Sequence, residues 1–559
     1  MKIIIVGGVA GGATTATRLR RLSEKDEIIL LEKDEYVSFA NCGLPYHIGE
    51  VIEDREDLFV QTIPGMKQRY NIDIRNFSQV ISIDPKNKQV TVKKVLADKI
   101  YTESYDKLIL STGAKPIKPP LKGMDDADNI FTLTNVPSMD AIINYKKTHE
   151  VKKATVIGGG FIGVEVAENL AHLGIEVTII EKLPQIMRPF DFEMAQILHR
   201  ELNKHDVKLV LGDGISGFDN LGKTVLLESG KTIETDMTIL AIGVLPNNEL
   251  PKAANLKLGP RGHVVVSETY NVYDGSTGEV NKDIYAIGDM IEVYDFVDGS
   301  KTAIPLAWPA NRQARLVADH INNFAIKETK LLGASIIKVF NKTAASVGNN
   351  EGQLKMKKLP YTAIFAVRAN HASYYPGASD MVMKLLFNPE TGKIYGAQII
   401  GQDGVDKRID IISTVMKTYG TVYDLSDLQL AYAPPFGSAK DPVNILGYIA
   451  ENLKADVYKV FHYYDVDQLV EKGAFFLDVR TEEEFQYGHI KTAINIPIDE
   501  LRSRIDEIRV DKETPIYINC ESGARSYNAL SILKNLGYTN LFNLTGGFMS
   551  IRNSKYLPK

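Results

Sequence analysis

The sequence predicts a multidomain α/β protein, and three observations support this. A short strand, a glycine turn, a helix and a second strand follow one another at the N-terminus, and the same order recurs about 150 residues later. Beyond residue 325 short alternating strands precede helices, and the last segment of about 100 residues starts a new alternation of strands and helices. A chain of 559 residues is also too long for a single hydrophobic core.

The first unit has the order of a dinucleotide-binding βαβ unit. A strand over residues 2–6 is followed by the turn 7–12, a helix over 13–22 and a strand over 27–31 that ends at Glu32. Backbone amides of such a turn bind a pyrophosphate, and a carboxylate at the strand end accepts hydrogen bonds from ribose hydroxyls. Val9 stands where the fingerprint has its second glycine.

The second unit repeats this order with all three fingerprint glycines. A strand over 154–157 leads into the turn 158–163, a helix over 164–173 and a strand over 177–180 that ends at Glu181. A carboxylate at this position binds the 2′-hydroxyl of NADH and repels a 2′-phosphate. Lys182 and Arg188 lie nearby and could accept a phosphate. We therefore expect NADH, with NADPH as the open alternative.

The third region contains no cofactor motif. We expect strands over 335–340, 361–368, 381–387 and 394–400, then helices over 406–418 and 443–453. This α+β pattern is typical of a domain that forms an interface. A polar helical stretch then leads into the last unit, which has its own apolar strands.

Composition excludes several classes of function. The net charge of −5 gives no general attraction to nucleic acid or to an anionic membrane. No apolar run reaches the ~18 residues that a membrane span needs, so we expect a cytoplasmic protein without nucleic-acid or membrane partners. The chain has two cysteines, far apart at Cys42 and Cys520, and no close Cys/His cluster for a metal.

Cys42 lies in the segment Ser38-Phe39-Ala40-Asn41-Cys42-Gly43-Leu44-Pro45-Tyr46. This segment resembles the S-F-x-x-C motif of single-cysteine flavoproteins, which comprise coenzyme A-disulfide reductases, water-forming NADH oxidases and NADH peroxidases. Residues 283–289 resemble the second FAD fingerprint of this superfamily, and residues 111–113 and 241–247 resemble its two crossover segments. The resemblance covers about residues 1–450 and implies FAD in the first unit and NADH or NADPH in the second.

A single cysteine cannot form an internal disulfide. The oxidised form of Cys42 must therefore be a mixed disulfide with a small thiol or a sulfenic acid. Its place near a helix start and the flavin leads us to expect a thiol pKa well below the free value of ~8.5. Oxidases and peroxidases of the group carry a histidine in the first glycine loop, where this chain has Ala10. The resemblance therefore favours the coenzyme A branch.

The resemblance also implies the residues of the site. In this branch two tyrosines of the partner subunit lie near the reactive sulfur, which predicts a homodimer and assigns Tyr374 and Tyr432, the latter as proton donor. The expected FAD ligands are Gly7, Gly8, Val9, Ala10, Gly12, Glu32, Lys33, Thr112, Gly113, Gly288 and Asp289. The expected NAD(P)H ligands are Gly158, Gly160, Phe161, Ile162, Gly163, Glu181 and Gly243. The expected coenzyme A ligands are Thr14, Arg18, Arg21, Ser38, Asn41 and Lys440.

The last unit contains a second sulfur motif. Residues 477–481, 488–490 and 520–526 resemble a single rhodanese domain over about residues 458–557. Four residues separate Cys520 from Arg525, so successive N–H groups can form an anion-binding nest around the sulfur. The resemblance implies a persulfide on Cys520, with Arg525 adding positive charge. Related phosphatases have a loop one residue longer, and an inactive binding module would usually have lost the cysteine.

These observations predict two Rossmann-like domains, an α+β dimerisation domain and an α/β rhodanese domain. The expected boundaries are 1–112 with 245–322 for FAD, 113–244 for NAD(P)H, 323–448 for dimerisation, 449–457 for a linker and 458–557 for the rhodanese domain. The predicted activity is NAD(P)H-dependent reduction of coenzyme A disulfide, coenzyme A persulfide or polysulfide through Cys42, coupled to sulfur transfer through Cys520. Two alternatives stay open: an oxidase or peroxidase with a Cys42 sulfenic acid, and a sulfur-trafficking protein with a docking rhodanese domain.

Overall fold

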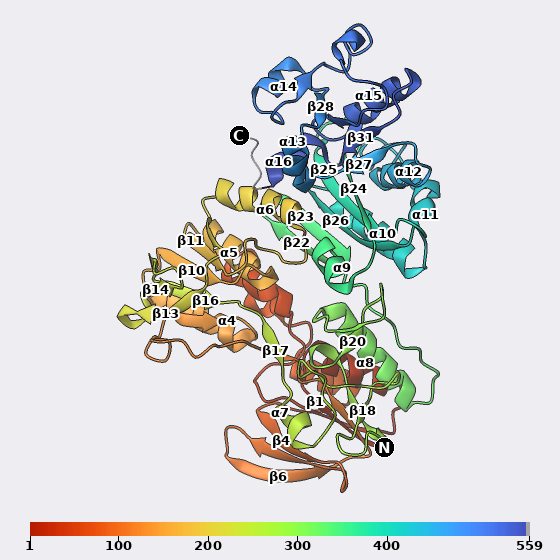
Figure 1. Cartoon of the computed structure of the whole chain (residues 1–559). Coiled ribbons are helices and arrows are strands. Elements are labelled where there is room, and N and C mark those ends of the chain that lie inside the picture. Colours follow the sequence, from red (N-terminus) through yellow and green to blue (C-terminus); the bar gives the residue numbers. More distant parts are fainter. Residues whose placement is uncertain (555–559) are drawn as a thin grey trace. The chain divides into compact units, whose positions relative to one another are not determined.

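The computed structural model describes residues 1–554 (Figure 1). The chain forms two compact units. Unit 1 comprises Met1–Pro184 and Asp206–Gly333, and unit 2 comprises Gln185–His205 and the chain from Ala334 onward. Unit 1 contains both predicted nucleotide-binding folds, whereas unit 2 contains the predicted dimerisation and rhodanese folds.

The first nucleotide-binding fold is a six-stranded sheet. Its strands, in spatial order, are β18 (Asn271–Tyr273), β19 (Val280–Ala286), β7 (Lys107–Leu110), β1 (Lys2–Val6), β2 (Glu27–Leu31) and β3 (Asp73–Arg75). β1 pairs in parallel with β2 and β7, which places the glycine turn at the carboxyl edge of the sheet centre. Helices α1 (Ala10–Leu22) and α8 (Ala307–Ile321) pack together. A separate three-stranded sheet consists of β4 (Ser78–Asp84), β5 (Gln89–Lys94) and β6 (Lys99–Ser104).

The second nucleotide-binding fold is a five-stranded parallel sheet. Its strands, in spatial order, are β12 (Lys208–Leu211), β11 (Glu176–Glu181), β10 (Lys153–Ile157), β16 (Met237–Leu240) and β9 (Ile130–Thr132). Helices α4 (Val136–Thr148) and α5 (Phe161–His172) belong to this fold, and a small antiparallel sheet of β13 (Ile215–Asp219), β14 (Thr224–Leu227) and β15 (Thr232–Glu234) adjoins it. Both fingerprint helices begin three residues earlier than predicted, because the last fingerprint residues already form the first helical turn.

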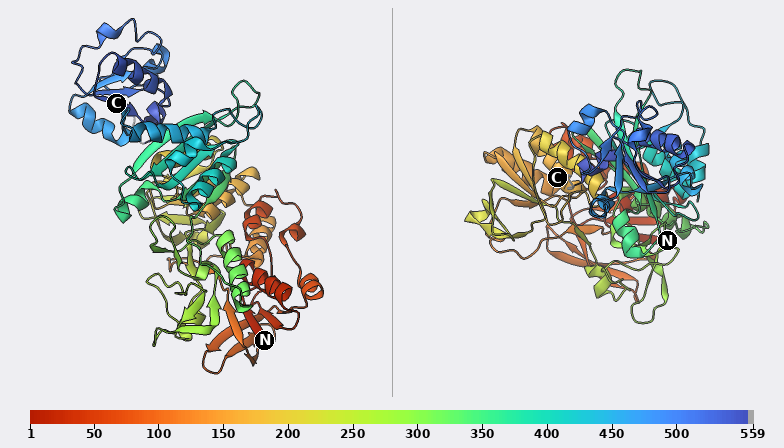
Figure 2. Two further views of the ribbon diagram at one scale, coloured as in Figure 1. Left: turned by 90° about the vertical axis from the view of Figure 1, so that its right-hand side faces the viewer. Right: turned by 45° about the horizontal axis from the view of Figure 1, so that its top comes forward.

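The antiparallel sheet of unit 2 confirms the predicted strands and adds one. Its strands, in spatial order, are β22 (Ser335–Val339), β23 (Lys342–Gly348), β26 (Ile394–Gly401), β25 (Asp380–Phe387) and β24 (Thr362–Ala369). β23 escaped prediction because its Ala and Ser side chains are buried between two neighbouring strands and give no alternation of apolar and polar residues. Helices α10 (Val405–Lys417) and α12 (Pro442–Lys454) pack against this sheet (Figure 2). The remaining helices here are α9 (Glu351–Lys357) and α11 (Val422–Asp427).

Two expected boundaries differ from the fold. The stretch before the last unit is helical as expected, but α12 continues to Lys454 with Ala450 buried, so most of the predicted linker 449–457 belongs to this helix. Residues 185–205, expected in the nucleotide-binding domain 113–244, group with unit 2. Their helix α6 (Phe192–Lys204) contacts β22, β26 and the C-terminal helix α16 (Gly547–Asn553).

Buried charges explain why α6 belongs to unit 2. The ammonium of Lys384 on β25 lies 2.8 Å from Asp191, 2.5 Å from Glu193 and 2.5 Å from Glu351, and all four side chains are buried. Tyr463, in the C-terminal fold, donates a hydrogen bond of 3.1 Å to Glu193. The three carboxylates are close enough to bind a metal ion, but the Lys384 ammonium already supplies the cation among them.

The C-terminal fold is a five-stranded parallel sheet. Its strands, in spatial order, are β27 (Lys459–Phe461), β31 (Leu541–Leu544), β30 (Ile516–Asn519), β28 (Phe475–Asp478) and β29 (Ile494–Asn495). Its helices include α13 (Val466–Glu471), α14 (Glu482–Gln486) and α15 (Ala524–Asn535). Within residues 1–554, no helix has the length and apolar character needed to cross a membrane.

Candidate functional site

The first glycine loop is tightly packed against its own sheet. A side chain at Gly12 would come within 1.8 Å of the Gly7 carbonyl oxygen, and one at Gly7 within 2.3 Å of the Ser111 carbonyl oxygen. The buried Glu32 carboxylate accepts hydrogen bonds from the N–H groups of Gly8 at 2.7 Å and Asp34 at 3.0 Å. A carboxylate has about four acceptor positions, so Glu32 retains capacity for ribose hydroxyls.

The second glycine loop has the same construction. Glu181 accepts hydrogen bonds from the N–H groups of Gly159 at 2.8 Å and Leu183 at 2.9 Å. Gly158 and Gly163 are packed against backbone, whereas the space beside Gly160 is open, as close approach of a pyrophosphate requires. Both loops therefore fit a dinucleotide.

Of the two basic residues near Glu181 in sequence, Lys182 lies with it in unit 1. Lys182 forms a surface ion pair of 2.7 Å with Glu228. Arg188 belongs to unit 2. The carboxylate of Glu181 is thus the dominant charge at the end of β11 within unit 1.

The two crossover segments meet at the first nucleotide fold. The Thr112 hydroxyl donates to the Asn247 carbonyl at 3.0 Å, and the Asn247 amide donates to the Thr112 carbonyl at 2.6 Å. Beside them β8 (Ala114–Pro116) pairs with β17 (Val244–Pro246). The N–H of Gly288 donates to Gln313 at 2.7 Å, and burial raises the pKa of the adjacent Asp289 to about 6. The predicted FAD segments are therefore joined in one fold.

Cys42 lies on a single 3₁₀ turn, Asn41–Gly43, directly before the short helix α2 (Leu44–Ile48). Its side chain is exposed, yet desolvation raises the pKa of the thiol, and the carboxylates of Glu165 and Asp289 raise it further. This contradicts the expected low pKa. A helix of five residues contributes little favourable field, and the nearest charges of the chain are negative.

Glu165 is a residue of this site that sequence reasoning missed. It lies on α5, and burial together with the neighbouring Glu168 raises its pKa to about 7. Helix α5 packs against α2, where Gly49 lies against Asn169. An acidic residue in an apolar helix after a glycine loop carries no signal of its own, so only the fold places it near Cys42.

The predicted coenzyme A ligands of unit 1 differ from one another in the contacts that they make. Arg18 forms an ion pair of 2.6 Å with Asp319 on α8, and Thr14 donates to Asn311 at 2.6 Å. Arg21 contacts only the Tyr70 phenol among the described residues, by a hydrogen bond of 3.3 Å and by stacking over the ring. Ser38 and Asn41 lie on the segment that carries Cys42. Arg20 is buried and binds backbone carbonyls, which is a structural role.

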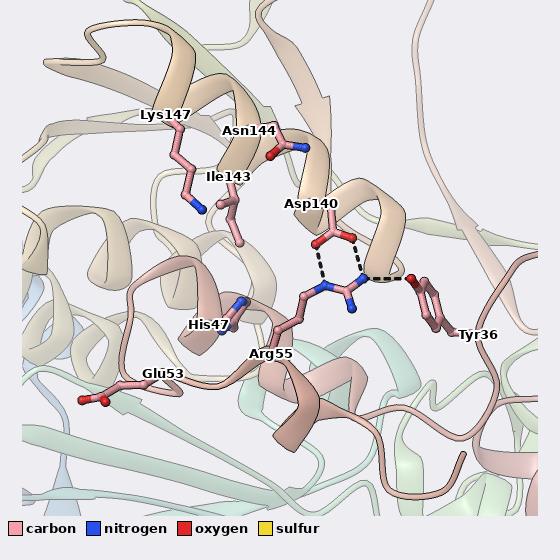
Figure 3. A pocket seen from close by; sticks show the side chains of 8 residues that line it. All are labelled: Tyr36, His47, Glu53, Arg55, Asp140, Ile143, Asn144 and Lys147. Carbon is pink, nitrogen blue, oxygen red and sulfur yellow. Dashed lines mark hydrogen bonds and ion pairs between the residues drawn. The ribbon is translucent and has the colours of Figure 1, made fainter. Parts of the chain in front are cut away.

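A pocket of about 510 Å³ lies between the segment after Cys42 and helix α4 (Figure 3). Arg55 binds both oxygens of Asp140, at 3.0 and 2.7 Å, and donates to the Tyr36 hydroxyl at 3.1 Å. His47, Glu53, Asn144 and Lys147 complete the polar lining that Figure 3 draws around this pair. None of these residues was predicted, and the Arg55–Asp140 pair neutralises the strongest charges of the pocket.

Unit 2 brings the two predicted tyrosines together. The hydroxyls of Tyr374 and Tyr432 lie 2.8 Å apart, although 58 positions separate these residues in sequence. Both rings are exposed, at 75% and 47%. The hydrogen bond between the two hydroxyls holds the pKa of Tyr432 above its ordinary value, so Tyr432 keeps its proton at neutral pH. The N–H of Ala372 donates to the Pro434 carbonyl at 3.3 Å and ties the two loops.

The second cysteine is fully buried at the end of β30. The N–H of Gly523 donates to the Cys520 sulfur at 3.1 Å, and the Ser526 hydroxyl lies 3.4 Å from it. Gly523 has a positive φ of 99°, which glycine adopts without strain. This loop leads into α15, and the Gly523 N–H is the one backbone donor to the sulfur among the described residues.

Arg525 differs from the expectation in one respect. Its guanidinium binds both oxygens of Glu484, at 2.6 and 2.7 Å, rather than standing free beside the sulfur. This hydrogen-bonded pair lowers the pKa of Glu484 to about 2. Glu484 thus fixes the guanidinium and offsets its charge. His489 stacks on Phe485, as expected of a structural histidine.

Comparison with known families agrees with this geometry. Residues 1–359 match the pyridine nucleotide-disulphide oxidoreductase family, residues 334–442 match its dimerisation domain, and residues 463–554 match the rhodanese-like domain. A coenzyme A disulfide reductase of Staphylococcus aureus is 38% identical over 453 residues, covering 80% of this chain and all of the relative.

Solved structures extend the likeness to the whole chain. The reduced CoADR-RHD of Bacillus anthracis has a TM-score of 0.96 and 48% identity, covering 100% of this chain and 99% of that one. An NAD-dependent persulfide reductase from A. fulgidus has a TM-score of 0.90 and 33% identity, covering 98% and 100%. A water-forming NADH oxidase from Lactobacillus brevis has a TM-score of 0.77 and 27% identity, covering 82% and 99%. The chain belongs to the pyridine nucleotide-disulphide oxidoreductase family, whose members use FAD and NAD(P)H, and carries a C-terminal rhodanese-like domain.

Proposed function

We propose that the protein reduces coenzyme A disulfide and coenzyme A persulfide at Cys42, and that Cys520 delivers sulfane sulfur to coenzyme A. The observation that carries the proposal is the pair of unlike cysteines. Cys42 is exposed beside two nucleotide folds and has no second cysteine within the same motif, whereas Cys520 is buried in a loop of N–H donors. The relatives named for coenzyme A disulfide and for persulfide support both halves of the reaction.

The proposed chemistry at Cys42 is thiol–disulfide exchange. The Cys42 thiolate attacks one sulfur of coenzyme A disulfide, the sulfur–sulfur bond breaks, and one coenzyme A thiolate leaves. Tyr432 of the partner subunit donates its proton to that thiolate, and Tyr374 orients the Tyr432 hydroxyl. Bound FAD supplies two-electron redox chemistry between NADH and sulfur. The two electrons cleave the mixed disulfide on Cys42 and release the second coenzyme A.

A persulfide reacts in the same way. Attack of Cys42 on the inner sulfur releases hydrosulfide and leaves the same mixed disulfide. The Cys520 thiolate attacks the sulfane sulfur of a donor such as thiosulfate, sulfite leaves, and Cys520 carries a persulfide. The coenzyme A thiolate then takes the outer sulfur, which gives coenzyme A persulfide and restores the Cys520 thiol. The presence of both activities in one chain raises the effective concentration of the intermediate, which favours persulfide as the physiological substrate.

The cofactor and ligand residues are proposed as predicted from sequence. Gly7, Gly12 and Glu32 would hold FAD together with the Thr112 and Asp289 segments. Gly158, Gly160, Gly163 and Glu181 would hold the nicotinamide cofactor, with NADH preferred because the adjacent Lys182 is paired with Glu228 and leaves the Glu181 carboxylate for the ribose. We propose a homodimeric, cytoplasmic enzyme with no nucleic-acid or membrane partner. Its domain boundaries follow the predicted ones, except that 185–205 groups with unit 2 and α12 replaces the linker.

The test compares three purified proteins: the wild type, Cys42→Ser and Cys520→Ser. NADH oxidation with coenzyme A disulfide should be lost in Cys42→Ser and retained in Cys520→Ser. Sulfide release from thiosulfate plus coenzyme A should be lost in both variants. Mass spectrometry of the oxidised wild type should find an adduct with the mass of coenzyme A on Cys42.

Other outcomes identify the alternatives. NADH turnover that needs only oxygen or peroxide, with a sulfenic acid on Cys42, would assign the protein to the oxidase group represented by the Lactobacillus brevis relative. Full sulfide release by Cys520→Ser would mean that the rhodanese-like domain binds a partner instead of transferring sulfur.

A further inference from the structure

A buried hydroxyl beside the Cys520 sulfur has two possible hydrogen-bond partners. It belongs to Ser526 on α15, which packs against β31 (Figure 1). The Ser526 hydroxyl lies 2.6 Å from the Oδ1 of Asn543 on β31 and 3.4 Å from the Cys520 sulfur. Both Ser526 and Asn543 are buried. Asn543 was not among the residues that the sequence indicated.

A second contact fixes the orientation of the Asn543 amide. The amide nitrogen Nδ2 lies 3.2 Å from the Gly523 carbonyl oxygen. A backbone carbonyl can only accept, so the amide must turn its nitrogen to Gly523 and its oxygen to Ser526. The opposite orientation would set two carbonyl oxygens against each other. Because Oδ1 can only accept as well, the Ser526 hydroxyl must be the donor to Asn543.

This donation determines what Ser526 can offer to the sulfur. A serine hydroxyl has one proton and two lone pairs, and a separation of 2.6 Å is at the short end of the O–H···O range. With its proton held by Asn543, Ser526 presents a lone pair to Cys520. The lone pair can accept from the thiol, whereas a proton turned to the thiolate would leave the buried Oδ1 without a donor. The arrangement therefore favours the thiol.

The charged groups around the loop 520–525 form pairs that involve neither Ser526 nor Asn543. These pairs are Arg525 with Glu484 on α14, Arg552 on α16 with Glu521, and Arg480 with Asp478 on β28. Glu521 also lies 3.9 Å from Arg480. The phenols of Tyr458, Tyr527 and Tyr538 are in or against the core that contains the sulfur. Substitution of Ser526 or Asn543 leaves all these groups in place.

We propose that Asn543 is a positioning residue for sulfur transfer, because it holds the Ser526 hydroxyl as an acceptor toward the Cys520 thiol. The thiolate is the nucleophile, so Asn543 sets the pH above which Cys520 becomes reactive. The inference rests on the sulfur-transfer role proposed for Cys520 and adds a residue that controls this role.

The test follows the ionisation of Cys520 without relying on turnover. The chain has two cysteines, so the full-length, FAD-loaded Cys42→Ser protein labelled with ¹³C at cysteine Cβ gives one cysteine signal, that of Cys520. The chemical shift of this signal changes when the thiol ionises, and its pH titration gives a midpoint. Sulfite release from thiosulfate, with coenzyme A as acceptor, is measured over the same pH range with Cys42 intact.

Three variants are compared with this parent protein: Asn543→Leu, Ser526→Ala and the double variant. Ser531→Ala is the matched control, because it removes a hydroxyl from the same helix, where Ser531 donates to the Tyr527 carbonyl at 3.0 Å. In Asn543→Leu the Gly523 carbonyl keeps its hydrogen bond of 3.2 Å from the Tyr527 N–H.

Asn543→Leu frees the Ser526 hydroxyl to donate to the thiolate, so the midpoint should fall by about one pH unit. Ser526→Ala removes the acceptor of the thiol proton and should lower the midpoint by roughly half a unit. In the double variant the Asn543→Leu change should add no further fall. The control should keep the parent midpoint, and the pH profile of sulfite release should move with the titration.

Two results would overturn the proposal. A midpoint of Ser526→Ala equal to or above that of the parent would mean that the hydroxyl donates to the thiolate in the native loop. An effect of Asn543→Leu that is the same with and without Ser526 would mean that Asn543 acts through the loop alone. If Asn543→Leu does not fold, Ser526→Ala decides by itself. If the wild type releases no sulfite from thiosulfate, the proposed role of Cys520 fails, and the titration still decides the role of Asn543.

Discussion

Replacing Lys384 by methionine should destabilise unit 2 in a way that acid reverses. The substitution keeps most of the buried side-chain volume but removes the buried cation that Asp191, Glu193 and Glu351 share. Glu351 then retains only the exposed Lys355 among the described residues, at 3.4 Å. Breaking a buried ion pair by removing one partner costs about 3–5 kcal/mol, and here three carboxylates lose the same partner. For a unit of this size each kcal/mol lowers the melting temperature by about 2–4 °C. We therefore expect a decrease of about 10 °C in the transition of unit 2 at neutral pH.

The stability of the wild type and that of the variant should change with pH in opposite directions. In the wild type, burial favours the protonated form of Glu351, but attraction to Lys384 outweighs it and holds the pKa at about 2. A depressed folded-state pKa contributes stability above the unfolded-state value, and this contribution is lost as the pH falls toward 2. Without Lys384, burial and mutual repulsion raise the carboxyl pKa values in the folded state. Stability is then present at low pH and is lost as the pH rises.

The assay is hydrogen exchange of the amides of α6 and β25, followed together with thermal unfolding at about pH 5 and about pH 8. The variant should exchange faster than the wild type at the higher pH, and the difference should narrow at the lower pH. Lys338→Met, an exposed substitution in the same sheet, serves as the control. If the variant is less stable than the wild type by the same amount at both pH values, the electrostatic reasoning is refuted and the loss of stability is a packing defect.

Three further predictions concern the sites. Glu165→Gln removes a carboxylate that raises the pKa of Cys42, so the pH midpoint for alkylation of Cys42 by iodoacetamide should move down, whereas Glu228→Gln on the surface should leave it unchanged. Glu181→Ala should weaken NADH binding about tenfold through loss of a ribose hydrogen bond and reduce discrimination against NADPH, as measured by the ratio of the two kcat/KM values; an unaltered ratio would contradict the role of Glu181. Glu484→Gln breaks a charged contact to Arg525 and should slow thiosulfate sulfur transfer by about tenfold without changing NADH turnover; wild-type transfer would show that the fixed guanidinium is dispensable.

The parts of the site that were predictable are those encoded by local sequence. A glycine turn followed by a helix, a strand and an acidic residue specifies its own geometry, and Glu32 and Glu181 indeed accept hydrogen bonds from the loops before them. The same holds in part for the loop at Cys520, where the spacing predicts several N–H groups and the Gly523 N–H donates to the sulfur. The pairing of Tyr374 with Tyr432 was predicted only through resemblance, because no periodicity links positions 58 residues apart.

The parts that escaped prediction depend on tertiary contacts. Arg368 is an ordinary strand residue until the fold places it in one pocket with Lys440. Glu484 resembles any acidic residue of a first helical turn until it binds Arg525. The transfer of α6 to unit 2 follows from the burial of Lys384 on a strand that comes some 180 residues later. Partners so distant in sequence leave no local pattern in a single chain.

The two cysteines have different neighbouring groups, and these groups determine which chemical form of the Cys42 sulfur the chain favours. The chain supplies Cys520 with an N–H donor from Gly523, in a buried loop that leads into α15. Around Cys42 the chain partly excludes water and places the carboxylates of Glu165 and Asp289. Both effects raise the pKa of the thiol and favour the neutral thiol or a disulfide over the thiolate. Nucleophilic attack needs the thiolate, so the chain by itself disfavours reaction at Cys42 at neutral pH. Reactivity there must come with a ligand that stabilises the thiolate, and the pH midpoint for alkylation of Cys42 should therefore be lower in the FAD-loaded protein than in the cofactor-free chain.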